Sequence, residues 1–125
     1  MLSGIESQTW AFWNLCDEGG KDMAEWSERY PLTKRDVEMY APYSAGVYRL
    51  TNKVGTKQMV FFVGQSGRLG EDIMNHISRK ETRECVKEHL GNFDCFFRFA
   101  ESGSAEEREQ MVKEQVEEYQ PSCNA

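Results

Sequence analysis

The chain lacks several features that would place it in a special class of protein. None of its 125 residues lie in an apolar run of the roughly 18–20 residues that a membrane helix needs. Its N-terminus has no basic segment followed by an apolar one, as a secretory signal would have. These absences argue against a membrane partner and predict a cytoplasmic protein.

Cysteine and histidine are scarce, and their spacing is uninformative. The four cysteines, Cys16, Cys85, Cys95 and Cys123, form no CxxC pair, and without a secretory signal we expect them to be reduced and partly buried. Cys85 and His89 are four residues apart and can share a helix face as half of a metal site. No second pair with ligand spacing joins them, so the sequence favours reduced thiols.

The composition that is present fits one ordinary domain. Apolar residues make up 39% and charged residues 29% of the chain, and this length can bury a core without cross-links. The net charge of −6 argues against a protein that binds nucleic acid over its whole surface. The charge is uneven, because residues 43–80 hold six basic and two acidic side chains. A local nucleic-acid-binding segment and an ordinary solvated surface with uneven charge explain this distribution equally well.

The N-terminal third predicts a helical extension, residues 1–42, packed on a domain spanning 43–125. Thr33 resembles an N-cap, and Pro31 and Pro42 end helical segments. The predicted helices cover residues 5–16, 22–29 and 34–40. The tryptophans of this part can pack in the core or stack on bases, and we favour the core for all three: Trp10, Trp13 and Trp26.

From residue 46 the pattern becomes that of strands. Gly46–Thr51 and Gln58–Gly64 are rich in valine and aromatic residues, and the polar stretch between them predicts an antiparallel hairpin. Met59–Val63 is apolar on both faces, which is typical of a central strand. Asn92–Ala100 alternates and predicts a third strand. The sheet is therefore expected to be small, three-stranded and largely antiparallel.

Helices are predicted to flank this sheet, giving an α/β (α+β) fold. The first covers residues 69–80, and the second covers 82–90 with Gly91 as its C-terminal cap. The last begins at Ser104, whose S-x-x-E pattern is that of a capping box, and runs to about Tyr119.

One acidic residue of the last helix is unexpected. Glu109 falls in a stripe of otherwise apolar residues at helical spacing, where a carboxylate is costly unless it is paired, protonated or bound to a cation. A structural ion pair and a functional carboxylate explain it equally well. The stripe contains Ala105, Val112, Val116 and Tyr119.

Five short motifs follow one another over residues 43–124. They are Gly46-Val47-Tyr48, Phe62-Val63-Gly64, Gln65-Ser66-Gly67 with the helix ending in His76, Glu107-Arg108-Glu109, and Asn124. Their order and spacing resemble those of the GIY-YIG nuclease superfamily. The likeness is to the N-terminal domain of excision-repair incision nucleases and to phage homing endonucleases.

The resemblance implies a metal-dependent endonuclease that hydrolyses phosphodiester bonds of DNA and contacts mainly its backbone. Glu109 would hold one Mg²⁺ or Mn²⁺, which polarises the phosphate, and Tyr48 would activate or orient the attacking water. The implied catalytic residues are Tyr48, His76, Glu109 and Arg68. The implied substrate-binding residues are Gly64, Gln65 and Asn124.

The chain departs from the family pattern at two positions. Asp72 stands where the phosphate-binding arginine is expected, and we expect it to repel a phosphate. Arg68 lies one helical turn earlier and can either compensate or pair with Asp72. Phe62 lacks the hydroxyl of the second tyrosine. Two functions remain open: an endonuclease with weak or rerouted activity, and a degenerate module that binds nucleic acid or protein without catalysis.

Overall fold

The computed structural model of the chain describes residues 25–78 and 80–124, which form an α+β domain built on one antiparallel sheet. The strands lie in the order β2-β5-β3-β4. Their bounds are β2 Tyr30–Pro31, β3 Gly46–Val54, β4 Lys57–Ser66 and β5 Asp94–Glu101. The predicted fold class is confirmed, although the sheet has four strands instead of three. Because β2 has only two residues, it gives no alternating pattern in the sequence.

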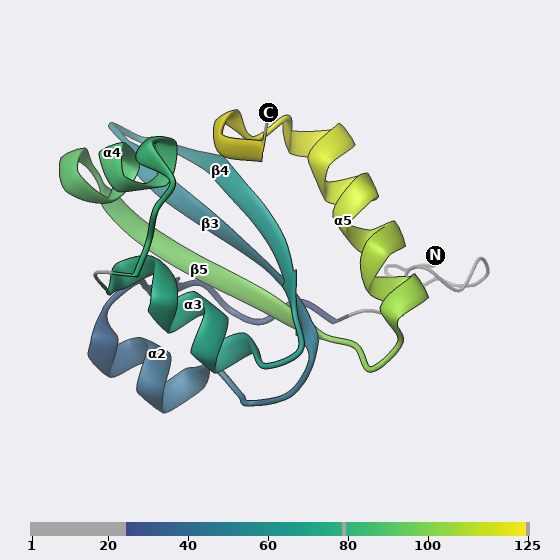
Figure 1. The fold of residues 1–125 in the computed structure, drawn as a ribbon. Coiled ribbons are helices and arrows are strands. Elements are labelled where there is room, and N and C mark those ends of the chain that lie inside the picture. The colour runs from purple at the N-terminus through teal and green to yellow at the C-terminus, as the bar shows by residue number, and fades with distance from the viewer. Residues whose placement is uncertain (1–24, 79, 125) are drawn as a thin grey trace, which may run out of the picture.

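Helices cover both faces of the sheet (Figure 1). On one face, α2, α3 and α4 enclose a large apolar cluster that includes Leu50 and Phe97. On the other face, α5 packs Met111 against Val47 and Val63. The alternation of side chains along β3 sends Val47 and Leu50 into opposite clusters. The helices are α2 Lys34–Tyr40, α3 Leu69–Ile77, α4 Glu84–Asn92 and α5 Ala105–Tyr119, followed by the 3₁₀ turn η2 Ser122–Asn124.

The predicted hairpin forms between β3 and β4, and it turns at Gly55, whose φ of +65° suits glycine. Its register shifts once, because Leu50 pairs with Phe62 while Thr51 pairs with Val60. Phe61 is the extra residue of this β-bulge. The bulge lets Phe61 and Phe62 enter the same cluster, although neighbours in a regular strand face opposite sides.

The prediction that Met59–Val63 forms a central strand is wrong. β3 and β5 are the inner strands of the sheet, and β4 lies at its edge. The apolar pattern has another cause, since the two apolar clusters cover β4 from opposite faces. Part of the open edge is covered by the chain end. The Asn124 side chain accepts from the Val63 amide and donates to the Val63 carbonyl, both at 2.8 Å.

Several helix boundaries follow the sequence. Thr33 caps α2, and Ser104 caps α5 by accepting from the Glu107 amide. Gly91 is not a cap, because α4 continues to Asn92. The segment 25–29 is not helical, which contradicts the helix predicted over 22–29. The helix predicted over 5–16 lies outside the described residues. Likewise α3 ends at residue 77 and not at 80.

Residues 25–42 contribute both a helix and a strand, and the proposed domain division at residue 42 stays a prediction. Trp26 packs against the α5-side cluster and stacks with the Arg49 guanidinium at 4.5 Å, as a core role requires; Trp10 and Trp13 lie outside the described residues. Over residues 25–78 and 80–124, no helix is long and apolar enough to cross a membrane.

The expectation that the cysteines are reduced is wrong for two of them. Cys85 of α4 and Cys123 of η2 form a disulfide across 38 positions of sequence separation. Cys95 is a free cysteine, and Cys16 lies outside the described residues. The disulfide ties the chain end to α4, and spacing alone gives no sign of it, because the pairing depends on the fold.

Candidate active site

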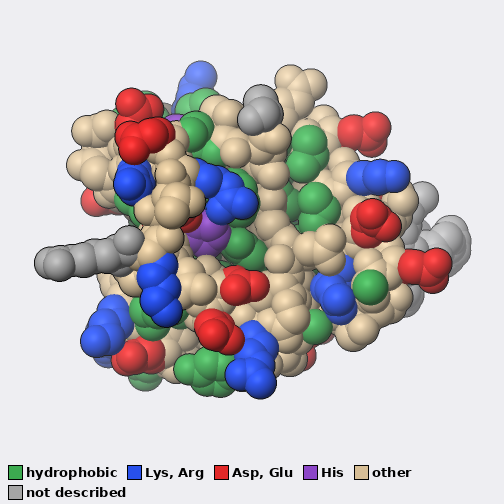
Figure 2. Space-filling view, in the orientation of Figure 1, with side chains coloured by type: hydrophobic (Ala, Val, Ile, Leu, Met, Phe, Trp, Pro, Cys, Tyr) green, Lys and Arg blue, Asp and Glu red, His purple; other side chains and the backbone are tan. Residues whose placement is uncertain are grey.

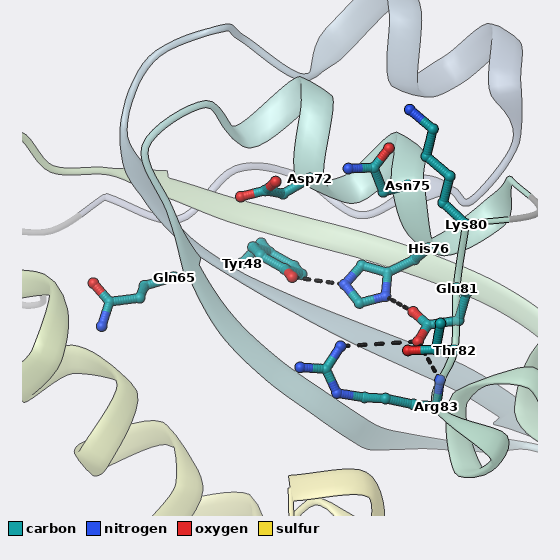
Figure 3. A pocket seen from close by; sticks show the side chains of 9 residues that line it. All are labelled: Tyr48, Gln65, Asp72, Asn75, His76, Lys80, Glu81, Thr82 and Arg83. Atoms are coloured by element: carbon teal, nitrogen blue, oxygen red, sulfur yellow. Dashed lines mark hydrogen bonds and ion pairs between the residues drawn. The ribbon is translucent and has the colours of Figure 1, made fainter.

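A polar cavity of about 290 Å³ opens beside α3 and the hairpin. In the orientation of Figure 1, Figure 2 shows a histidine side chain recessed between basic and acidic side chains. Nine residues line the cavity and are drawn in Figure 3. They are Tyr48, Gln65, Asp72, Asn75, His76, Lys80, Glu81, Thr82 and Arg83.

Glycine at position 64 makes room for the phenol of Tyr48. The two residues pair across the hairpin. A Cβ on Gly64 would lie 2.8 Å from the Tyr48 hydroxyl oxygen and 2.9 Å from the ring carbon that carries it. Side chains do not approach this closely, so the glycine of the second motif allows Tyr48 to lie over the hairpin backbone and reach α3.

Tyr48, His76 and Glu81 form a hydrogen-bonded chain at the buried side of the cavity (Figure 3). The Tyr48 hydroxyl lies 2.6 Å from Nε2 of His76. Nδ1 of His76 contacts the Glu81 carboxylate, whose second oxygen accepts from the Arg83 amide at 2.7 Å. The exposed fractions of the three residues are only 4%, 5% and 7%. Their polar atoms are therefore satisfied mainly by one another.

The electrostatics of this chain favour one arrangement of protons. Burial lowers the pKa of His76, against the contrary effect of Glu81, so the imidazole is neutral near pH 7. Hydrogen bonds from Arg83 and His76 outweigh desolvation and lower the pKa of Glu81, which keeps it ionised. Burial, followed by the nearby Asp72, raises the pKa of the Tyr48 phenol. An ionised Glu81 accepts from Nδ1–H, which leaves Nε2 to accept the Tyr48 proton.

Arg83 supplies the cation nearest to this chain. Its guanidinium lies below Tyr48 and His76 in Figure 3 and packs 5.0 Å from the centre of the Phe62 ring. A cation over an aromatic face is favourable, so Phe62 supports Arg83 where a second tyrosine was expected. Lys80 also lines the cavity, although in Figure 3 its side chain points away from His76.

The other cavity-lining residues include one predicted contact and one predicted obstacle. Gln65 lies at the end of the cavity near α5, where its carbonyl accepts from Nε of Arg108 at 3.4 Å. Asp72 is half-buried on α3 and lines the cavity. The acidic residue thus stands in the cavity itself, as the motif spacing predicts.

Three predicted site residues do not meet Tyr48 in the cavity. Arg68 is exposed, pairs with Glu71 at 3.9 Å and lines a different cavity. Glu109 is exposed on α5 and is absent from the lining of the candidate site; the prediction that it lies on a buried stripe is wrong. The amide of Asn124 is bonded to the backbone of β4.

No sequence pattern points to Glu81 and Arg83. Both lie between α3 and α4, and neither belongs to a recognisable motif. Glu81 contacts His76, and both residues line the same cavity as Tyr48. A buried carboxylate next to a histidine is visible only in three dimensions.

No protein-family model matches the chain, and no curated protein matches it in sequence. Solved structures do match it. The GIY-YIG N-terminal endonuclease domain of UvrC from Thermotoga maritima, bound to its catalytic magnesium, matches with a TM-score of 0.58 at 20% identity. The match covers 74% of this chain and 96% of that one. Two point mutants of the same domain, with a bound divalent cation, give TM-scores of 0.56 at 17% and 16% identity, and cover 74% of this chain and 94% of theirs.

These likenesses establish the architecture of the chain. It has the GIY-YIG nuclease-like fold that the motif order predicts. Sequence identities of 20% and below carry the fold and leave the chemistry to be argued from the cavity.

Proposed function

We propose that the protein is a Mg²⁺- or Mn²⁺-dependent endonuclease of GIY-YIG type that cleaves DNA weakly. The observation that carries this proposal is the buried Tyr48–His76–Glu81 chain in a polar cavity. It lies on the fold of an endonuclease domain described as bound to a catalytic divalent cation.

The hydrogen-bonded chain can move a proton away from an attacking water. Tyr48 is protonated before the reaction begins, because its pKa is raised, so a resting phenolate is not the base. The Tyr48 hydroxyl can take the water's proton while it passes its own to Nε2 of His76. Glu81 then stabilises the imidazolium through Nδ1. Such positioned acid–base groups contribute about 10²–10⁴-fold in rate.

Phosphate binding is the weak step of this proposal. The Arg83 guanidinium pairs with the buried Glu81 carboxylate at 3.8 Å, and its side chain is 56% exposed, so its remaining N–H groups can donate to a phosphate. Asp72 opposes it. Two charges about 4 Å apart at an effective dielectric of about 20 interact with roughly 4 kcal/mol before screening. Arg68, which the sequence offered as a substitute cation, pairs with Glu71 instead.

The metal is proposed to bind at Glu109, on the helix that borders the Gln65 end of the cavity. No ion pair or side-chain hydrogen bond engages this carboxylate within residues 25–78 and 80–124, and its hard oxygen atoms suit Mg²⁺. When bound, the ion supplies charge stabilisation at the scissile phosphate. The position of Glu109 outside the cavity lining makes it, with Asp72, a cause of weak cleavage.

DNA is the proposed partner, held mainly through its backbone. The cavity offers a phosphate the Arg83 guanidinium, and the described surface offers no broad basic face in the view of Figure 2. We also propose a cytoplasmic location, in which cysteine pairs are kept reduced.

The decisive experiment is a plasmid-nicking assay on the parent and on Asp72→Arg, with and without Mg²⁺. We expect slow nicking by the parent and about a 10²-fold gain in Asp72→Arg, because the substitution replaces repulsion with a phosphate contact. Asp72→Asn serves as the matched control and should give a smaller gain.

Glu109→Ala in the Asp72→Arg background should abolish the gain if Glu109 holds the metal. A loss of nicking in Asp72→Asn would contradict the proposal, because Asp72 would then be a required group such as the metal ligand.

The second candidate is a binding module without catalysis, which the carboxylate of Asp72 in the cavity favours. The binding-module function predicts that neither the parent nor Asp72→Arg nicks DNA with any divalent metal ion. It also predicts that Asp72→Arg binds DNA more tightly than the parent does. The same set of proteins therefore separates the two functions.

A further inference from the structure

A second cluster of reactive side chains lies away from the cavity, where the chain end meets α4. Cys85 and His89 are one turn apart on α4, and Cys123 comes from η2. One ligand atom from each lies within 4.8 Å of the other two. Two sulfur atoms and one imidazole nitrogen are donor types that Zn²⁺ sites in proteins use.

The ring of His89 is held with one nitrogen toward the chain end. Its Nδ1 contacts the side-chain amide of Asn52, which is 1% exposed, and its Nε2 lies 3.2 Å from the Ser122 hydroxyl. Phe61 stacks on the ring with centroids 4.5 Å apart. The ring is thus fixed on three sides, and Nε2 faces the segment that carries Cys123.

The orientation of the Asn52 amide decides which ring nitrogen of His89 is free to bind a ligand. The Asn52 side-chain oxygen is buried without a hydrogen-bond partner among the described residues. With the amide turned over, this oxygen accepts from Nδ1–H of His89, and the lone pair of Nε2 becomes available. Ligating histidines commonly donate their other ring nitrogen to such a partner.

We propose that Cys85, His89 and Cys123 are the three protein ligands of a Zn²⁺ site when the two cysteines are reduced, with a water molecule in the fourth position. The site and the disulfide are alternative states of the same residues. A dithiol reductant gives two electrons and two protons to the disulfide and becomes a disulfide itself. Zinc then binds two thiolates, and the two thiol protons are released.

The site has a structural consequence that does not depend on nuclease activity. Either cross-link ties η2 to α4, and η2 carries the Asn124 side chain that covers the edge of β4. In a reducing compartment the disulfide opens, and zinc binding would then keep the chain end in place. Structural zinc contributes its binding free energy to folding.

The test uses Co²⁺ as a spectroscopic probe on the full chain, reduced with a phosphine under nitrogen. A Cys16→Ser background removes the cysteine that lies outside the described residues. We expect one equivalent of Co²⁺ to produce thiolate charge-transfer bands and the visible bands of tetrahedral cobalt, and Zn²⁺ to displace it. The oxidised protein can be tested without the Cys16→Ser substitution, and it should bind no Co²⁺.

Variants assign the ligands. Cys123→Ser should lose the charge-transfer bands of the complex, and His89→Gln should weaken binding at least tenfold. Asn52→Ala should weaken it about 10–100-fold, the usual effect of losing a partner of the ligand. Cys95→Ser is the matched control and should bind normally, because Cys95 is not one of the three residues whose ligand atoms come together.

Zinc should also raise the melting temperature of the reduced protein and leave that of the oxidised protein unchanged. The proposal is overturned if the reduced parent forms no one-to-one complex at micromolar metal. It is equally overturned if the complex persists after Cys123→Ser or in the oxidised protein.

Discussion

His76 links the two groups that decide the chemistry of the cavity, because one ring nitrogen contacts Tyr48 and the other contacts Glu81. Its protonation state therefore affects both stability and proton transfer. A neutral imidazole is required at Nε2 to accept the Tyr48 proton, and the burial that keeps it neutral also makes its protonation costly.

The first prediction concerns the pH dependence of stability. The pKa of His76 is lower in the folded than in the unfolded chain. Its contribution to stability is therefore complete above the unfolded value of about 6.5 and is lost as the pH falls below it. Each pKa unit of lowering corresponds to about 1.4 kcal/mol. We expect the urea midpoint to fall between pH 7 and pH 5, and to fall less in His76→Gln.

His89→Gln is the control for this measurement, because the chain has only two histidines. The lowered pKa of Glu81 acts in a separate window, since its contribution is lost only below the usual carboxylate range. An unchanged slope between pH 7 and pH 5 in His76→Gln would show that another group carries the dependence.

Of the three residues in the buried hydrogen-bonded chain and the arginine beside it, the sequence points to Tyr48 and His76 and misses the other two. Tyr48 and His76 were found because each belongs to a motif with local spacing. Glu81 and Arg83 were missed because their roles depend on the path of the chain after α3, which no local pattern encodes. Helical spacing alone suggests Arg68 as a substitute cation. It does not reveal that Arg68 pairs with Glu71, three residues further along the helix.

At the scale of elements, the hairpin and α5 were predictable because their signals are local: a polar turn, a capping box and a terminal proline. The face of α5 that packs on the sheet was not predictable. Met111, which no stripe through Glu109 includes, is its buried residue, and the six residues before Met111 in the helix contain only Ala105 as an apolar guide. The edge position of β4 was likewise hidden, because two-sided burial is the same for a central strand and for an edge strand covered from both faces.

The second prediction tests the packing of the hairpin against the site. Gly64→Ala places a methyl group against the Tyr48 phenol, and overpacking of this kind costs about 1–3 kcal/mol. We expect lower stability and, in the Asp72→Arg background, reduced nicking, because Tyr48 must shift away from His76. Denaturant midpoints and nicking rates are the measurements.

Gly67→Ala is the matched control, since a Cβ there meets no atom within 4 Å. It should change neither stability nor nicking by a comparable amount. Equal effects of the two substitutions would mean that the backbone freedom of glycine matters, and not the space that Tyr48 occupies.

At the scale of the whole molecule, charge limits how the protein can hold DNA. The chain carries a net charge of −6, and acidic and basic side chains intermingle on the face shown in Figure 2. Among the residues that the structure describes, Lys80 and Arg83 bring positive charge to the lining of the candidate site. The proposed DNA contact is therefore expected to involve a few phosphates at one place, with the remainder of the duplex repelled.

The last prediction follows from this count of cations. The logarithm of a DNA-binding constant falls with the logarithm of salt concentration by about 0.9 for each phosphate neutralised. With two cations at the cavity we expect a slope of about −2 for the parent. Asp72→Arg should steepen it by about one, and Arg83→Gln should make it shallower by about one. Fluorescence anisotropy with a short labelled duplex, in Ca²⁺ to prevent cleavage, measures the slopes.

Arg68→Gln is the control for the slopes, because Arg68 pairs with Glu71 away from the candidate site, and it should leave the parent's value unchanged. A parent slope near −6 would mean that DNA contacts a much wider surface than the cavity. A slope that responds to Arg68→Gln and not to Arg83→Gln would move the phosphate-binding position to Arg68 at the start of α3, one helical turn before the position that the motif spacing predicts.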